Sequence, residues 1–292
     1  MSVSQFFESF AGELQLPASK KTSIANRTAA IARRLNKDFR ETDSDASNRF
    51  YGGSYGRNTA VDTLSDVDLL CVLPYSTYKR VNEYATPQST LLREVKESLL
   101  KTYPGSNIFV DSQIVKIPYT DGITFEVVPV FENTDGSYTY ANTNGGGSWE
   151  VCKPKEEIAA FAERNKAANL NLVVLGRMVR AWRDYNSVGM SGMLIDTLAW
   201  QFIDTWAHKD KSYLYYDYLT RDFFQWLSER DKTQTYWRVP GSGAFAYKGS
   251  NFQAKAETAH TIALAAIANC ENQEWWAAKQ KFRSIYGTGF PQ

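Results

Sequence analysis

The apolar patterning of the chain changes character near residue 150, and this change constrains the fold more than any other feature. Before it, short runs rich in β-branched and aromatic residues indicate strands, and two longer segments show helical spacing. The expected strands cover 49–53, 67–73, 107–118, 123–131 and 137–141, and the expected helices cover 20–42 and 88–102. A mixed sheet with a long N-terminal helix should therefore form the first part.

The second part carries helical spacing almost throughout. Its expected helices cover 154–168, 170–186, 191–207, 213–229 and 252–285, with a turn at Pro240-Gly241-Ser242-Gly243. The Gly-rich stretch 142–148 indicates a linker, and Pro154 can open a helix in its first turn. We therefore predict an α+β protein with a sheet-containing domain over 1–150 and a helical domain over 151–292.

A Gly-Ser turn lies eleven residues ahead of two closely spaced carboxylates. Gly53 and Ser54 are followed by Asp66 and Asp68 in a strand-like run. Because side chains alternate along a strand, both carboxylates should lie on one face. Mg²⁺ prefers such oxygen ligands, and a pair of ions can stabilise the attacking and leaving oxygens of a displacement. The glycine allows backbone N–H groups to approach a triphosphate, and Ser54 is expected at a helix N-terminus that favours anions.

A third acidic residue is needed to hold the metal that activates an attacking hydroxyl. Glu126 is the candidate, because a carboxylate in the apolar run 123–129 is costly unless it is paired or metal-bound. Glu126 could instead point to solvent. Asp121 is the substitute ligand, although its Asp-Gly context indicates a turn.

Two further segments offer contacts to phosphate. Arg177 and Arg180 fall outside the apolar stripe of the helix over 170–185, about 60° apart, where they could meet a triphosphate or simply be solvated. Ser191 precedes an apolar helical run and is well placed as an N-cap, and that helix N-terminus could also bind phosphate.

The overall composition excludes several other classes of protein. The 33 basic and 32 acidic residues nearly cancel, so the total charge gives no support for stable nucleic-acid or membrane binding. No long apolar run or signal sequence is present, and three widely spaced cysteines fit reduced thiols, so we expect a cytoplasmic protein. A Gly-Lys-Ser/Thr phosphate loop is also missing, which disfavours P-loop hydrolysis.

The order of these motifs resembles the polymerase-β-like nucleotidyltransferases. Within that superfamily, Arg57-Asn58-Thr59-Ala60, Arg180-Ala181-Trp182 and the run 191–196 resemble the bacterial CD-NTases, relatives of cyclic GMP-AMP synthase and oligoadenylate synthase. The resemblance implies a nucleotidyltransferase sheet and a helical lobe that completes an active-site cleft. It also implies synthesis of cyclic di- or trinucleotides from nucleoside triphosphates, and effector proteins that receive these messengers in antiphage defence (CBASS).

Carried onto this chain, the resemblance makes Gly53 and Ser54 triphosphate-binding residues. Asp66 and Asp68 become ligands of two Mg²⁺ ions, for which Mn²⁺ can substitute, and Glu126 becomes the third ligand. The chain departs from the family pattern at two positions, because the third acid is usually Asp and the residue before Ala181-Trp182 is often Lys rather than Arg180.

Two other interpretations stay open at this point. The chain could transfer nucleotides to RNA, a protein or a small molecule, or it could be a nucleotide-binding module whose active site has lapsed at Glu126.

Overall fold

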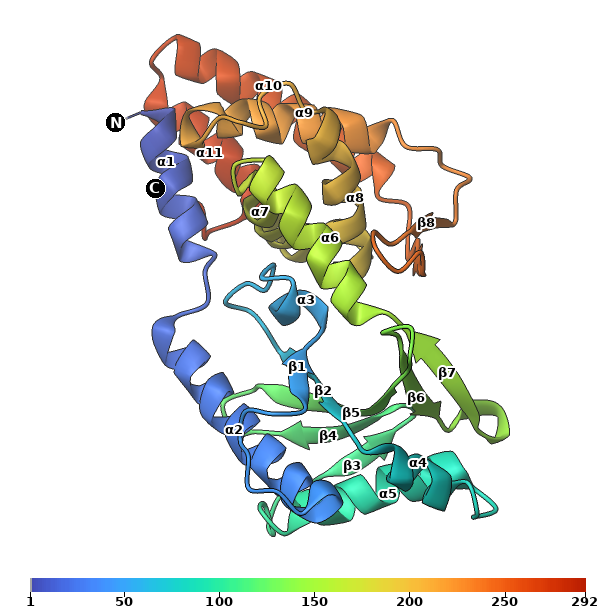
Figure 1. The fold of residues 1–292 in the computed structure, drawn as a ribbon. Helices are drawn as coiled ribbons and strands as arrows, with labels where there is room; N and C mark the ends of the chain where they lie inside the picture. The colour runs from blue at the N-terminus through green and yellow to red at the C-terminus, as the bar shows by residue number, and fades with distance from the viewer. Residues whose placement is uncertain (1) are drawn as a thin grey trace. The chain divides into compact units, whose positions relative to one another are not determined.

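A computed structural model describes residues 2–292, and its contacts divide the chain into two compact units (Figure 1). The sheet unit contains Leu16–Gly56 and Thr63–Lys155. The helical unit contains the chain up to Gln15, Arg57–Asp62 and Glu156–Gln292. The predicted division falls between residues 150 and 151; the division by contacts falls between Lys155 and Glu156, and it also places the chain up to Gln15 and Arg57–Asp62 in the helical unit.

Seven strands form the sheet of the first unit, which is mixed as the sequence predicts, although only five strand segments were expected. The strands are β1 (Arg49–Tyr51), β2 (Asp66–Val72), β3 (Phe109–Asp111), β4 (Ile114–Pro118), β5 (Thr124–Glu132), β6 (Tyr138–Asn142) and β7 (Ser148–Cys152). The order is β1-β2-β5-β4-β3, and β6 pairs with both β5 and β7. Only β2 and β5 run parallel, and their register places Asp68 beside Glu126.

Apolar side chains hold three helices against one face of this sheet. The helices are α2 (Ala18–Arg40), α4 (Tyr75–Val81) and α5 (Pro87–Leu100). Alternate residues of the central strands, such as Val67, Leu69, Phe125 and Val127, are fully buried in this core. By period two, the carboxylates at positions 66, 68 and 126 must lie on the opposite face.

Seven helices and a small hairpin form the second unit. The helices are α1 (Val3–Glu13), α6 (Pro154–Ala167), α7 (Asn171–Tyr185), α8 (Gly192–Thr205), α9 (Tyr216–Ser228), α10 (Gln253–Glu271) and α11 (Trp275–Tyr286), and β8 (Tyr236–Arg238) pairs with β9 (Phe245–Tyr247). Helix α1 belongs here because Phe7 packs edge-on against Phe282 and Phe290, with ring centroids 4.9 and 5.2 Å apart.

Several element predictions are wrong in detail. The stretch 142–148 is the connection of the β6–β7 hairpin rather than a linker, with a 3₁₀ turn at Asn144–Gly146. The run 107–118 contains a reversal and forms two paired strands, and 252–285 is two helices separated at residues 272–274. Within residues 2–292, no helix is long and apolar enough to cross a bilayer.

Candidate active site

The Gly-Ser turn packs directly onto one of the predicted carboxylates. Gly53 has a φ of +55°, and a Cβ built on it would lie only 1.7 Å from Oδ2 of Asp68. The neighbouring Gly52 N–H donates to the Asp68 carbonyl at 2.9 Å. Only glycine fits at position 53, both because its backbone is left-handed and because a side chain there would collide with the carboxylate.

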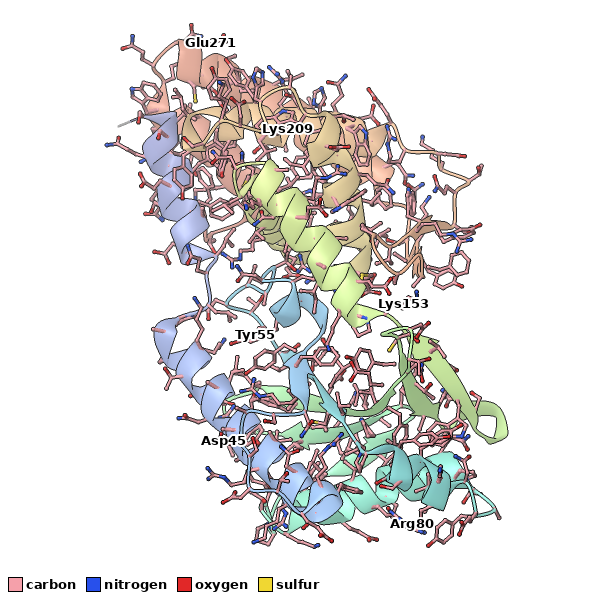
Figure 2. All side chains as sticks on the ribbon, in the orientation of Figure 1. Asp45, Tyr55, Arg80, Lys153, Lys209 and Glu271 are labelled. Carbon is pink, nitrogen blue, oxygen red and sulfur yellow. The ribbon has the colours of Figure 1, made fainter. Side chains whose placement is uncertain are left out.

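Ser54 lies near the start of a helix, as expected, but this helix, α3 (Gly53–Gly56), is a single turn. Four residues are too few to build up a helix dipole, so any anion binding here must come from the N–H groups of the turn itself. Tyr55, labelled in Figure 2, packs edge-on against Tyr51 at 4.6 Å between ring centroids and fixes the turn to β1.

Asp66 and Asp68 share one face of the sheet, as predicted from the period of two, and the strand register places Glu126 on the same face. Asp68 and Glu126 are register partners on neighbouring parallel strands, which lie about 4.8 Å apart. Asp66 is exposed and accepts a hydrogen bond from Oγ of Ser65 at 2.7 Å. Glu126 is half-buried on this face rather than directed into the apolar core.

Glu126 already has a cationic neighbour. Lys116, its register partner on β4, places Nζ 3.3 Å from Oε1 of Glu126 and 2.9 Å from Oδ2 of Asp111. The hydrogen bond to Asp111 raises the pKa of Lys116, with a smaller contribution from Glu126. One ammonium group is therefore shared between the expected third metal ligand and an aspartate on the edge strand.

Within the described residues, no three His, Cys, Asp or Glu side chains converge closely enough to hold an ion by themselves. The donor set nevertheless fits Mg²⁺ or Mn²⁺, because such ions commonly take one or two protein carboxylates and complete their shell with substrate phosphates and water. Asp66 and Asp68 supply those two carboxylates beside the Gly53 turn. Glu126 could join them once it separates from Lys116.

Asp121, the substitute ligand, has a different structural role. Its carboxylate receives two hydrogen bonds from Arg27, at 3.0 and 2.8 Å, and one from the backbone N–H of Ile123. The guanidinium of Arg27 is the largest cause that holds the pKa of Asp121 below its usual range. Asp121 therefore makes the turn before β5, which leaves Glu126 as the candidate third ligand.

Arg180 is buried in the helical unit and is held by Asp196. Its two terminal nitrogens donate to both Asp196 oxygens at 2.7 and 2.9 Å, and also to the carbonyls of Gly176 and Gly192. With an exposed fraction of 3%, Arg180 lacks the open surface that phosphate contact would need. The expectation of direct contact does not fit this geometry, because α7 is buried along most of its length and has no solvated side at this position.

Asp196 is the centre of this buried cluster. Besides Arg180, it accepts hydrogen bonds from Nε of Arg57 at 2.9 Å and from the Thr59 hydroxyl at 3.0 Å. Burial alone would raise the pKa of Asp196, but the guanidinium groups of Arg180 and Arg57 outweigh it and hold the pKa below its usual value. The cluster fixes the segment 57–62 to α7 and α8.

Arg177 is also buried but has no carboxylate partner among its hydrogen bonds. One terminal nitrogen donates to the backbone carbonyl and the side-chain oxygen of Asn58, at 2.9 and 3.0 Å. Its Nε is buried without a hydrogen-bond partner. Burial, and then repulsion from Arg180, lowers the pKa of Arg177. A buried cation with an unused donor is the kind of group that an anion would stabilise.

Ser191 caps α8, as predicted. Its hydroxyl accepts a hydrogen bond from the backbone N–H of Leu194 at 3.1 Å. The residue is exposed, so the first turn of this fourteen-residue helix is accessible. A contact between Ser191 and phosphate stays a prediction.

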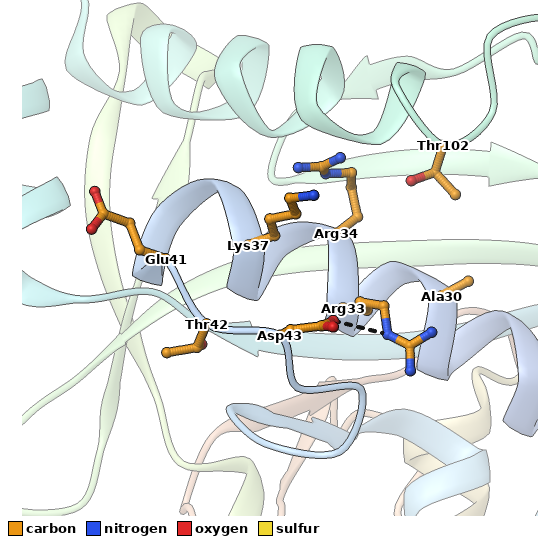
Figure 3. A pocket seen from close by; sticks show the side chains of 8 residues that line it. All are labelled: Ala30, Arg33, Arg34, Lys37, Glu41, Thr42, Asp43 and Thr102. Carbon is orange, nitrogen blue, oxygen red and sulfur yellow. Dashed lines mark ion pairs between the residues drawn. The ribbon is translucent and has the colours of Figure 1, made fainter.

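A separate cavity in the sheet unit lies along α2 (Figure 3). Arg33, Arg34 and Lys37 line it, but Arg33 forms an ion pair with Asp43 at 3.2 Å and Arg34 forms one with Asp38. Acidic partners thus offset much of its positive charge. None of the three predicted metal ligands lines this cavity.

A family model described as the Second Messenger Oligonucleotide or Dinucleotide Synthetase (SMODS) domain matches residues 1–165, more than half of the 292 residues. The chain belongs to the SMODS family. This confirms the resemblance to CD-NTases inferred from its motifs. The matched range includes the Gly53 turn and all three predicted metal ligands.

One curated relative and two solved structures resemble this SMODS protein. A probable cyclic nucleotide synthase from Bacillus cereus (strain VD146) is 25% identical over an alignment of 174 residues that covers 50% of this chain and 53% of the relative. The chain thus spans about half the length of that relative.

In both structural matches the sequence identity is 14%. The CdnC:HORMA-deltaN complex of E. coli MS115-1 matches with a TM-score of 0.70 over 99% of this chain and 98% of the other. Vibrio cholerae DncV cyclic AMP-GMP synthase matches with a TM-score of 0.71 over 96% of this chain and 93% of the other. These structures confirm the predicted fold.

Three residues that shape these sites in the SMODS protein were not predicted from the sequence. Lys116 lies ten residues before Glu126, and only the strand register brings them together. Asp196 lies within the apolar run 193–200, where an isolated carboxylate could have been recognised as a paired one. Arg57 was quoted within a motif but was given no partner.

Proposed function

We propose that the protein is a divalent-metal-dependent nucleotidyltransferase that makes a cyclic di- or trinucleotide from nucleoside triphosphates and releases pyrophosphate. The observation that carries the proposal is the packing of Gly53 on Asp68. It brings a phosphate-binding type of turn against a carboxylate on the sheet face that carries Asp66, Asp68 and Glu126, which we call the polar face. Membership of the SMODS family supports the same reaction. The DncV structure contains the linear intermediate 5′ pppA(3′,5′)pG, which is an expected stage of such a synthesis.

In this proposal Asp66, Asp68 and Glu126 hold the divalent cations, Mg²⁺ in the first instance. The bound cations would lower the pKa of the attacking 2′- or 3′-hydroxyl and stabilise the departing pyrophosphate. The backbone of Gly53 and the hydroxyl of Ser54 would orient the triphosphate. A second attack by the linear product would close the ring.

The helical unit would contribute positive charge rather than metal ligands. Arg177 is the candidate for a phosphate contact, because it is a buried cation with an unused donor. Arg180 would act indirectly, by holding Asp196 and the segment 57–62 in place. Ser191, at the accessible end of α8, would be a second phosphate contact.

We further propose that the product acts as a messenger in antiphage defence and is received by a separate effector protein. Solved SMODS-like structures contain a HORMA partner in one case and ATP or GTP in others. The bound nucleotides support nucleoside triphosphates as the substrates here.

The test is to incubate the purified protein with four labelled nucleoside triphosphates and Mg²⁺ or Mn²⁺, and to analyse phosphatase-resistant products. We expect a cyclic product, which has no terminal phosphate and therefore resists the phosphatase. Asp66→Asn and Asp68→Asn should each lower its rate by about a thousandfold or more, since each removes a ligand that stabilises the transition state. The matched control is Asp45→Asn, which changes a half-exposed aspartate paired with Arg33. Activity equal to wild type in the Asp68→Asn variant would contradict the proposal.

A further inference from the structure

Lys116 is placed to control the third carboxylate of the proposed metal site. Its side chain lies on the same sheet face as Glu126, because the two residues are register partners on β4 and β5. Nζ lies 3.3 Å from Glu126 and 2.9 Å from Asp111, which lies at the end of β3. The lysine is 24% exposed, so water screens these ion pairs only in part.

An ammonium group and a divalent cation compete for the same carboxylate. Both are attracted to Glu126, and they repel each other when they approach it together. A metal ion can therefore bind Glu126 only if the ammonium group of Lys116 is held away from this carboxylate. Asp111 provides the means, since it already binds the same Nζ at the shorter distance.

We propose that Lys116 is a positioning residue for Glu126: it holds this carboxylate in the metal-free protein, and Asp111 retains the lysine when Glu126 turns to the metal. The inference rests on the proposed function, because it takes Glu126 as a metal ligand. It accounts for the ion pair that holds Glu126 on the sheet face it shares with Asp66 and Asp68.

A purely structural ion pair makes a different prediction. If Lys116 only linked β3, β4 and β5, its removal would lower the free energy of unfolding slightly and would not change the affinity for a divalent cation. The affinity for a divalent cation in the absence of nucleotide therefore separates the two roles. Unlike turnover, this measurement does not depend on finding the right substrates.

The experiment measures Mn²⁺ binding by electron paramagnetic resonance of the free ion, with the full chain and no nucleotide. Lys116→Met should bind Mn²⁺ about three- to tenfold more tightly than wild type, because the competing cation is lost. Asp111→Asn should bind it more weakly by a similar factor, because the lysine then has only Glu126 as its partner. The melting temperature of both variants should stay within about 2–4 °C of wild type.

Lys101→Met is the matched control. Lys101 pairs with Asp38 at 3.0 Å, and Asp38 belongs to α2, which covers the other face of the sheet. This variant should bind Mn²⁺ as wild type does. Equal Mn²⁺ affinity in Lys116→Met and wild type would overturn the inference. If Asp68→Asn also fails to weaken Mn²⁺ binding, the metal site of the proposed function is itself wrong, and the two failures are thus distinguished.

Discussion

The sheet unit and the helical unit each gather charged side chains, but with opposite imbalance. In the sheet unit, strands β2, β3 and β5 carry four carboxylates, two of which pair with one ammonium group. The carboxylates belong to Asp66, Asp68, Asp111 and Glu126, and the ammonium group to Lys116. This group of side chains therefore attracts cations.

Around Asp196 in the helical unit, three guanidinium groups accompany two carboxylates. Arg57 and Arg180 share Asp196, and Arg57 lies 3.8 Å from Glu157, but Arg177 has only Asn58. The excess is thus one buried positive charge. These two groups of side chains therefore differ in sign: carboxylates outnumber the ammonium group at Lys116, and guanidinium groups outnumber carboxylates around Asp196.

The largest expected effect comes from removing the charge of Asp196, which pairs with Arg57 and Arg180. Asp196→Asn leaves the guanidinium groups of Arg57 and Arg180 buried without their carboxylate, and should lower the free energy of unfolding by about 3–5 kcal/mol. Denaturant unfolding measures this. Asp210→Asn, which affects the exposed ion pair with Lys211, should cost much less, because water screens such a pair. Similar losses in the two variants would show that the cluster is not compensated as described.

The same cluster predicts a pH dependence. The folded pKa of Asp196 lies below its unfolded value of about 3.9, so its contribution is complete above that pH and is lost as the pH falls through the folded pKa. The unfolding free energy of wild type should therefore fall more steeply below about pH 4 than that of Asp196→Asn. Parallel curves for the two proteins would contradict this assignment.

Arg177, which has no carboxylate among its hydrogen-bond partners, should behave differently from Arg180, which pairs with Asp196. Arg177→Met should raise the KM for nucleoside triphosphate about tenfold or more, because a hydrogen bond to a charged group contributes about 1.5–3 kcal/mol. Stability should be unchanged or higher, since a buried unpaired charge is removed. Arg183→Met, on the same helix but paired with Asp184, serves as the control in steady-state kinetics. An unchanged KM in Arg177→Met would rule out its phosphate contact.

The smallest effect concerns the cap of α8. Ser191→Ala should lower the free energy of unfolding by about 1 kcal/mol, and Ser191→Gly by only a few tenths, because glycine is tolerated as an N-cap. If Ser191 also contacts phosphate, Ser191→Gly should raise the KM despite its nearly normal stability. A KM equal to wild type in that variant would leave Ser191 with capping alone.

Local periodicity left the direction of Glu126 open, but it was sufficient to predict the central strands and the face shared by Asp66 and Asp68. These features depend on alternation within a few residues, and the structure confirms them. The predicted strand that contains Asp111 and Lys116 was wrong, because its reversal at residues 112 and 113 has no Gly or Pro.

The environments of Arg177 and Arg180 could not be predicted in the same way. Helical spacing places both outside the apolar stripe, which favours solvent, but tertiary packing surrounds α7 on several sides. Asp196 determines that Arg180 is paired, and it lies sixteen residues away on another helix. The ion pair between Lys116 and Glu126 likewise depends on strand register, which no local pattern specifies.

The central claim is that the polar face of the sheet is a divalent-metal site for nucleotide chemistry. The most direct test is anomalous diffraction at the manganese edge from crystals grown with Mn²⁺ and a non-hydrolysable nucleoside triphosphate. The account predicts manganese peaks bound by Asp66 and Asp68, with Glu126 turned away from Lys116 and the triphosphate beside Gly53 and Ser54. Manganese and triphosphate bound elsewhere, with this face still holding its Lys116–Glu126 pair, would contradict it.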